Sequence, residues 1–156
     1  MTNEEFAHGL FRQATSRYRT INVAFQNEDY PYVVRTAQEC VELCLKALLI
    51  SVGIDPPKWH DVGAILQDHA SRFPSIGKQD IDEMAFISRN LRGDREKSMY
   101  GDDVLRLPPD RLYSKFDAEM AKTWAGKVFS ICSRFFKINP DPHPTRGEGT
   151  HKFPLP

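Results

Sequence analysis

A run of apolar residues at helical spacing limits the fold more than any other part of the sequence. It lies between Pro31 and Gly53, and its steps of three and four continue over about 20 residues. Its members are Val34, Ala37, Val41, Cys44, Leu45, Leu48 and Leu49. This spacing places them on one wide face of a helix about 30 Å long. Pro31 suits the first turn, where its missing amide costs nothing, and Gly53 suits the end.

The same periodicity predicts four more helices, at about residues 3–27, 61–73, 78–91 and 113–137. Their expected apolar faces are Phe6, Leu10, Ala14, Tyr18, Ile21 and Phe25; Val62, Ile65 and Leu66; Ile81, Met84, Ala85 and Ser88; and Phe116, Met120, Trp124, Val128, Ile131 and Phe135. No segment alternates like a half-buried strand, and no repeat indicates a solenoid. Because long helices with short links pack as antiparallel neighbours, we expect an all-α, up-and-down bundle of four to five antiparallel helices.

Several residues mark where these helices begin and end. Thr2 and Glu5 have the spacing of a capping box. His60 or Asp61 can cap the third helix, and the sequence leaves open whether the fourth continues past Gly93.

The chain of 156 residues fits one domain with its own core. We expect the bundle to occupy residues 1–137. Residues 138–156 contain five prolines and two glycines, with too few large apolar side chains to offset the entropy of ordering them. This segment is predicted to be a flexible tail.

Charge and cysteine content restrict the location and the partners. The 21 basic and 21 acidic residues balance, so any contact with nucleic acid must be local. The N-terminus lacks the features of a signal peptide, and no apolar run is long enough to span a membrane. The odd count of three cysteines fits a reducing compartment. We therefore expect a soluble, cytoplasmic protein without membrane contact.

Most sequence motifs of cofactor and metal chemistry are absent. The chain has no Cys-x-x-Cys pair, no His-Glu-x-x-His helix, no glycine-rich phosphate loop and no serine-nucleophile elbow. Cys40 and Cys44 lie four apart within an apolar pattern, where they behave as small apolar side chains. We expect neither a metal nor a cofactor.

Three stretches carry the most specific pattern in the chain. Residues 30–53 contain an alanine–glutamine pair, an aliphatic–glutamate pair, then Lys-Ala-Leu-Leu and a glycine. Residues 59–62 read Trp-His-Asp-Val, and residues 95–102 join an arginine–glutamate to a tyrosine–glycine. Together they resemble the HEPN family of nucleotide- and RNA-associated helical bundles, over about residues 18–135.

The resemblance implies a four- to five-helix bundle that forms a homodimer, with a cleft that faces RNA or a nucleotide. In catalytic members of the family, an arginine is followed four to six residues later by a histidine, and the pair acts as a metal-independent ribonuclease. Arginine holds the phosphate, and histidine exchanges a proton near neutral pH. Here Tyr100 stands at that interval after Arg95. A tyrosine is a poor base at neutral pH, although it can donate a hydrogen bond or stack on a base.

The candidate site therefore rests on one arginine-rich stretch and one helical pair. Three arginines within seven residues, flanked by glycines, suit phosphate binding. The candidates for nucleotide or RNA binding are Arg89, Arg92, Arg95, Tyr100, Glu42 and Lys46, of which Arg95 and Tyr100 are also candidates for catalysis.

Each group also has an ordinary structural interpretation. The arginines could form surface ion pairs with nearby carboxylates, which contribute little to stability. Those carboxylates are Asp94, Glu96, Asp102 and Asp103. Glu42 and Lys46 could form an i,i+4 pair on a solvated face, and the histidines His60 and His69 could cap or pack.

Three functions remain open. The first is a non-catalytic module that binds RNA or a nucleotide, with a separate nucleotidyltransferase as partner in a two-component, toxin–antitoxin-like system. The second is a metal-independent ribonuclease with a degenerate site, which tolerates Tyr100 or recruits His60 or His69. The third is a helical dimerisation module without a ligand.

Overall fold

The computed structural model describes residues 1–56, 58 and 61–142 of the chain. Within these residues it is all-α, as predicted. The elements are α1 (Asn3–Gln26), α2 (Tyr30–Ser51), α3 (Val62–Asp68), the 3₁₀ turn η1 (Ala70–Arg72), α4 (Lys78–Arg92), α5 (Lys97–Tyr100), α6 (Pro109–Leu112) and α7 (Lys115–Ile138).

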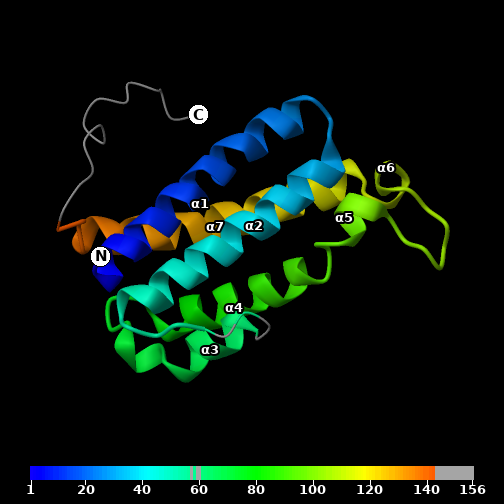
Figure 1. Cartoon of the computed structure of the whole chain (residues 1–156). Helices are drawn as coiled ribbons and strands as arrows, with labels where there is room; N and C mark the ends of the chain where they lie inside the picture. Colours follow the sequence, from blue (N-terminus) through cyan, green and yellow to red (C-terminus); the bar gives the residue numbers. More distant parts are fainter. Residues whose placement is uncertain (57, 59–60, 143–156) are drawn as a thin grey trace.

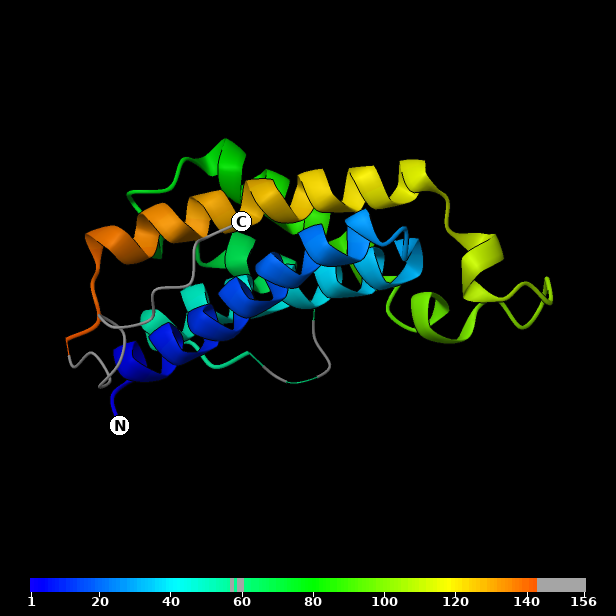
Figure 2. The same ribbon diagram turned by 90° about the horizontal axis from the view of Figure 1, so that it is seen from above.

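The long helices α1, α2, α4 and α7 lie side by side, and each runs opposite to the long helix before it in the sequence (Figure 1). The short helices α5 and α6 lie at one end of the bundle, and the link between them projects beyond it (Figure 2). This is the up-and-down bundle that the helical periodicity predicted. In the described part of the chain, no helix is both long and apolar enough to cross a membrane.

Helix α2 is the centre of the molecule. It packs against α1, α7, α4, α5, α3 and α6. Every residue of its predicted apolar face has at most 1% of its surface exposed. Its outward strip, which includes Glu39, Glu42 and Lys46, is the part left to form a site.

The predicted signals at the helix ends are present. Thr2 and Glu5 form the capping box of α1, and the Asp61 carboxylate accepts hydrogen bonds from the first amides of α3. Helix α2 has Pro31 in its first turn and is followed by Gly53 at φ +82°. The open question at Gly93 is answered, since α4 ends at Arg92.

Two predicted helix boundaries were wrong. The third helix is interrupted after Asp68, because the His69 amide bonds to carbonyls both three and four residues back and the chain tightens into η1. The last helix begins at Lys115 rather than Tyr113, because Ser114 and Asp117 form a second capping box that the sequence reading missed.

The predicted apolar faces of α1 and α7 were wrong in part. Phe6 is 47% exposed, and Phe116 and Met120 are 68% and 40% exposed. Small side chains form much of the buried faces instead, because they let helix backbones approach closely. Those residues are Ala7 and Ala24 in α1, beside the correctly predicted Ala14, and Ala118, Ala121 and Ala125 in α7. Of the predicted face of α4, Ser88 is only partly buried.

The predicted tail, residues 138–156, lies largely outside the described residues. Its first residue, Ile138, is the last residue of α7. Two residues that follow are close to α1: the Asn139 carbonyl oxygen lies 2.8 Å from His8 Nε2, and Asp141 pairs with Arg12 at 3.4 Å.

Candidate functional site

A cavity of about 880 Å³ opens between α2, the C-terminal end of α4 and the turn that leads into α5. We call it the Glu42 cavity. Four of the six candidate residues line it, namely Glu42, Lys46, Arg92 and Arg95. The other lining residues are Arg17, Gln38, Glu39, Val41, Leu43, Lys58, Val62, Ser88, Gly93, Glu96 and Lys97.

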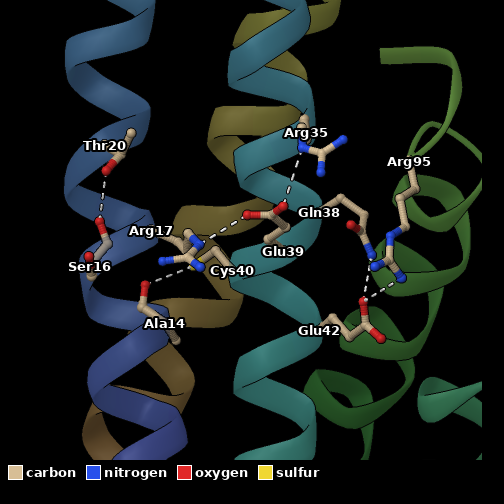
Figure 3. A network of polar contacts seen from close by, with 10 residues as sticks. All are labelled: Ala14, Ser16, Arg17, Thr20, Arg35, Gln38, Glu39, Cys40, Glu42 and Arg95. Atoms are coloured by element: carbon tan, nitrogen blue, oxygen red, sulfur yellow. Dashed lines mark hydrogen bonds and ion pairs between the residues drawn. The ribbon is translucent and has the colours of Figure 1, made fainter. Parts of the chain in front are cut away.

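The Glu42 carboxylate contacts several other side chains of the cavity lining, two of which, Gln38 and Arg95, are drawn in Figure 3. Its Oε2 accepts a hydrogen bond from Gln38 Nε2 at 2.8 Å and lies 3.9 Å from Arg95 Nη1. Its Oε1 lies 3.3 Å from Lys46 Nζ. Gln38, Glu42 and Lys46 are spaced four apart on α2, so they follow one face of the helix.

A second carboxylate, Glu39, joins α1 to α2 at the edge of the same cavity. Arg17 of α1 donates from Nε to Glu39 Oε2 at 3.0 Å, and Arg35 lies 3.3 Å from Oε1 (Figure 3). These pairs are partly exposed, so they contribute modestly to stability. Their effect is to fix the Arg17 guanidinium beside the cavity.

The turn that carries Arg95 is anchored on its inner side. Ser98 donates from its hydroxyl to the Arg95 carbonyl at 3.1 Å, and the Tyr113 hydroxyl donates to Asp94 Oδ1 at 2.9 Å. Burial raises the pKa of the Asp94 carboxyl, and the bond from Tyr113 opposes that shift. Burial, together with the neighbouring Asp94, raises the pKa of Tyr113.

The cavity concentrates positive charge in a chain that has none overall. Among the described residues that line it, six are lysine or arginine and three are glutamate, whereas the whole chain has 21 of each sign. The cations come from distant parts of the sequence: Arg17, Lys46, Lys58, Arg92, Arg95 and Lys97. Such a surface suits an anionic ligand, and phosphate above all, because arginine binds phosphate oxygens through paired donors.

The other candidates lie outside the cavity lining. The Arg89 side chain is 59% exposed, and its Nε lies 3.4 Å from Asp61 Oδ2. Tyr100 ends α5 with 73% of its surface exposed. His69 uses Nδ1 to bond with the Ile65 carbonyl at 2.9 Å, so it supports the end of α3. His60 lies outside the described residues.

Arg89 and Arg95 form surface ion pairs, but with other carboxylates than those expected from the sequence. Arg89 contacts Asp61 and Arg95 contacts Glu42, both distant in sequence, rather than the carboxylates beside them. Of those nearby carboxylates, Asp102 pairs with Lys97 at 3.9 Å.

Sequence reasoning missed Gln38 and Arg17 as parts of the cavity. Gln38 had a usable signal, since it precedes Glu42 by four residues and Lys46 by eight. Arg17 had none, because its place depends on how α1 crosses α2.

The three cysteines form a buried group between α2 and α7. Hydrogen bonding with Cys44 and burial raise the pKa of Cys40, and hydrogen bonding with Cys132 and burial raise that of Cys44. Cys40 and Cys44 therefore favour the protonated form, and all three cysteines are buried core side chains. Within the described residues, no three cysteine, histidine or acidic side chains are grouped as a metal ion requires.

Known proteins resemble this chain in sequence and in fold. The sequence matches the HEPN domain family over residues 7–135. Among proteins with curated descriptions, no match reaches significance. A solved structure with a similar fold is the crystal structure of TT1696 from Thermus thermophilus, with a TM-score of 0.64. The two chains are 21% identical, and the likeness covers 83% of this chain and 98% of TT1696. At this identity the likeness shows a shared fold.

Proposed function

Because the chain belongs to the HEPN domain family, we propose that it is a helical module that binds RNA or a nucleotide in the Glu42 cavity. The observation that carries this proposal is the gathering of six cationic side chains around one cavity in a chain of zero net charge. A local positive surface attracts phosphates without making the whole protein basic.

The proposed contacts follow from the geometry of the cavity. Arg92 and Arg95 bind phosphate oxygens, and Lys46 adds a further positive charge. Glu42 contacts Lys46 and Arg95, so it holds both cations in the cavity before a ligand arrives. Tyr100 and Arg89 lie outside the lining, and an exposed tyrosine offers a surface for base stacking.

Binding rather than cleavage is the activity we propose. Neither described histidine, His8 nor His69, lines the cavity. A ribonuclease would need Tyr100 or another group to exchange the proton that histidine transfers in the family's catalytic pair. The Arg95–Tyr100 pair has a tyrosine where the family's catalytic pair has a histidine.

We propose that a second copy of the chain is one partner. Phe116, Met120 and Trp124 are spaced four apart on α7. The ring centroids of Trp124 and of Phe86 in α4 lie 6.1 Å apart. Phe86, Phe116 and Met120 are 53%, 68% and 40% exposed, so they form an apolar patch. One turn beyond Trp124, Lys127 pairs with Asp80 and Glu83. Charges of both signs beside an apolar patch suit pairing with an identical surface.

The separate nucleotidyltransferase subunit of a two-component, toxin–antitoxin-like system is also part of this proposal. The projecting loop between α5 and α6 supports a protein partner, because Val104 and Leu105 expose 90% and 63% of their surfaces at its tip. Co-purification with a nucleotidyltransferase encoded beside this chain is the expected result. It should be lost when both residues become serine.

The experiment that tests the binding function measures fluorescence polarisation of labelled single-stranded RNA and of labelled ATP at low salt. Arg95→Ala should lower the affinity about tenfold, the loss expected for one charge-assisted contact. Arg134→Ala is the matched control, because Arg134 is exposed on α7, which contributes no residue to the cavity lining.

Each sample is also incubated with RNA in EDTA. Cleavage by wild type that disappears in Arg95→Ala would show that the protein is a ribonuclease rather than a binding module. No binding and no cleavage would contradict the proposal and leave a dimerisation module.

A further inference from the structure

One side chain in the Glu42 cavity has an unsatisfied buried acceptor. Among the described residues, the buried side-chain polar atoms without a hydrogen-bond partner are Arg19 Nε, Thr36 Oγ1 and Gln38 Oε1. Of these residues, Gln38 alone lines the cavity, and only 4% of its surface is exposed. A buried acceptor without a partner is unfavourable, so it requires a structural or functional explanation.

The orientation of this amide is fixed by its neighbour. Gln38 Nε2 donates to Glu42 Oε2 at 2.8 Å, because an amide nitrogen donates and a carboxylate oxygen accepts. The nitrogen must therefore face Glu42, and the carbonyl oxygen must be the free end. A phosphate cannot satisfy that oxygen, because an ionised phosphate has no proton to donate. The missing partner is a hydrogen-bond donor, such as a hydroxyl or an amine.

The position of Gln38 relative to the arginine selects between these donors. The Gln38 amide and the Arg95 guanidinium contact the same oxygen of Glu42, at 2.8 Å and 3.9 Å. A ligand that meets both must carry its donor close to a phosphate. The ribose 2′-hydroxyl is attached beside the phosphodiester, whereas the amino groups of the bases lie farther away.

We propose that Gln38 is a specificity-determining residue that accepts a hydrogen bond from a ribose 2′-hydroxyl and thereby distinguishes RNA from DNA. This inference rests on the proposed binding function of the Glu42 cavity. The Arg95 side chain is 61% exposed, and its distance of 3.9 Å from Glu42 is long for an ion pair. Arg95 can therefore exchange this carboxylate for a ligand phosphate at small cost in free energy. The exchange brings a ligand phosphate beside the Gln38 amide, and the 2′-hydroxyl is the group that separates the two nucleic acids.

The experiment compares three labelled single strands of the same sequence: oligouridylate, its 2′-deoxy form and its 2′-fluoro form. A 2′-fluorine keeps the sugar conformation of RNA but donates no hydrogen bond. The 2′-fluoro form therefore separates the effect of the hydrogen-bond donor from the effect of sugar conformation. Wild type should bind the ribose form about threefold to tenfold more tightly than either of the others, the ratio that one neutral hydrogen bond supplies. This ligand series needs no variant, so it remains decisive if a substitution prevents folding.

Two variants assign the effect to Gln38. Gln38→Met keeps the length of the side chain without its polar atoms and should bind the ribose and fluoro forms equally. Thr36→Val is the matched control: Thr36 also has a buried unpartnered oxygen, but it does not line the cavity, so the preference should persist. Circular dichroism checks that both variants are folded.

The outcomes separate this inference from the proposed function. Binding of the ribose and fluoro forms with equal affinity by wild type would overturn the inference and leave the binding function standing. A preference that survives in folded Gln38→Met would overturn the assignment to Gln38. Absence of binding to all three strands would overturn the proposed function, and the inference with it.

Discussion

The Asp94 carboxyl and the Tyr113 hydroxyl hold the arginine-bearing turn against the start of α7. Their hydrogen bond of 2.9 Å is partly buried. Burial raises the pKa of Asp94 from its ordinary value of 3.8, so the folded chain retains this proton to higher pH than the unfolded chain does. The stability that protonated Asp94 contributes is fully present below the unfolded pKa. It is lost as the pH rises through the folded pKa.

Asp94→Asn tests this pH dependence. Asparagine keeps an oxygen that can accept from Tyr113 and cannot ionise, so the variant should match wild type below about pH 4. As the pH rises above that value, the melting temperature of the variant should increase relative to that of wild type. Thermal unfolding between acidic and neutral pH measures the difference. A difference that shrinks as the pH rises would show that ionised Asp94 is stabilised by folding.

Only some positions in the cavity could be predicted from the sequence. Glu42, Lys46, Arg92 and Arg95 belong to local patterns, and they converge in the folded chain. The partners of the arginines could not be predicted, because Arg95 meets Glu42 only through the packing of α4 and α5 on α2. For the same reason, nothing local indicated that Arg89 would pair with Asp61 and stay outside the cavity lining.

Close packing between helices depends on small residues at their crossings. Gly63 of α3 lies so near α4 that an added Cβ would stand 2.8 Å from Ala85 Cα and 3.0 Å from its carbonyl oxygen. These are backbone atoms, which cannot turn aside as the end of a side chain can. The crossing places Val62 of α3 and Ser88 of α4 in the cavity lining.

Gly63→Ala should therefore destabilise the fold by about 1–3 kcal/mol, the usual cost of overpacking. Urea denaturation followed by circular dichroism measures it. Gly77→Ala is the control, because a Cβ at Gly77 would meet nothing within 4 Å. Equal stability of the two variants would mean that α3 and α4 separate without cost.

Helix positions could be predicted more reliably than their buried faces. The apolar stripe of α2 is wide enough that its burial follows from the pattern alone. In α7, large apolar residues and alanines lie on neighbouring stripes of the helix. In the N-terminal half of α7, the alanines are the residues that face the core. Size alone did not indicate which stripe is buried, because close helix packing favours small side chains where backbones approach.

The molecule as a whole has an apolar patch over α4 and α7 and a cationic cavity over α2 and α4. The patch consists of Phe86, Phe116, Met120 and Trp124. We proposed it as the surface where two copies meet. The cavity lining contains none of these four residues, so the two surfaces can be tested separately.

Sedimentation equilibrium tests the patch. Phe116→Ser should weaken dimerisation about tenfold or more, since exposed aromatic anchors carry much of an interface's energy. Phe6→Ser, on α1, is the control because it removes an exposed phenylalanine elsewhere. A monomeric wild type, or dimers of equal strength in both variants, would contradict the proposal.

The salt dependence of RNA binding tests the central claim that the Glu42 cavity binds phosphates. If the cavity binds phosphates, wild-type affinity should fall as salt rises, with a slope set by the number of phosphates bound. The Arg92→Ala, Arg95→Ala double variant should bind more weakly, and its slope should be smaller by about one for each phosphate that it no longer neutralises. Arg134→Ala should retain the wild-type affinity and slope. The same slope and affinity in all three proteins would contradict the account, because RNA would then bind elsewhere or not at all.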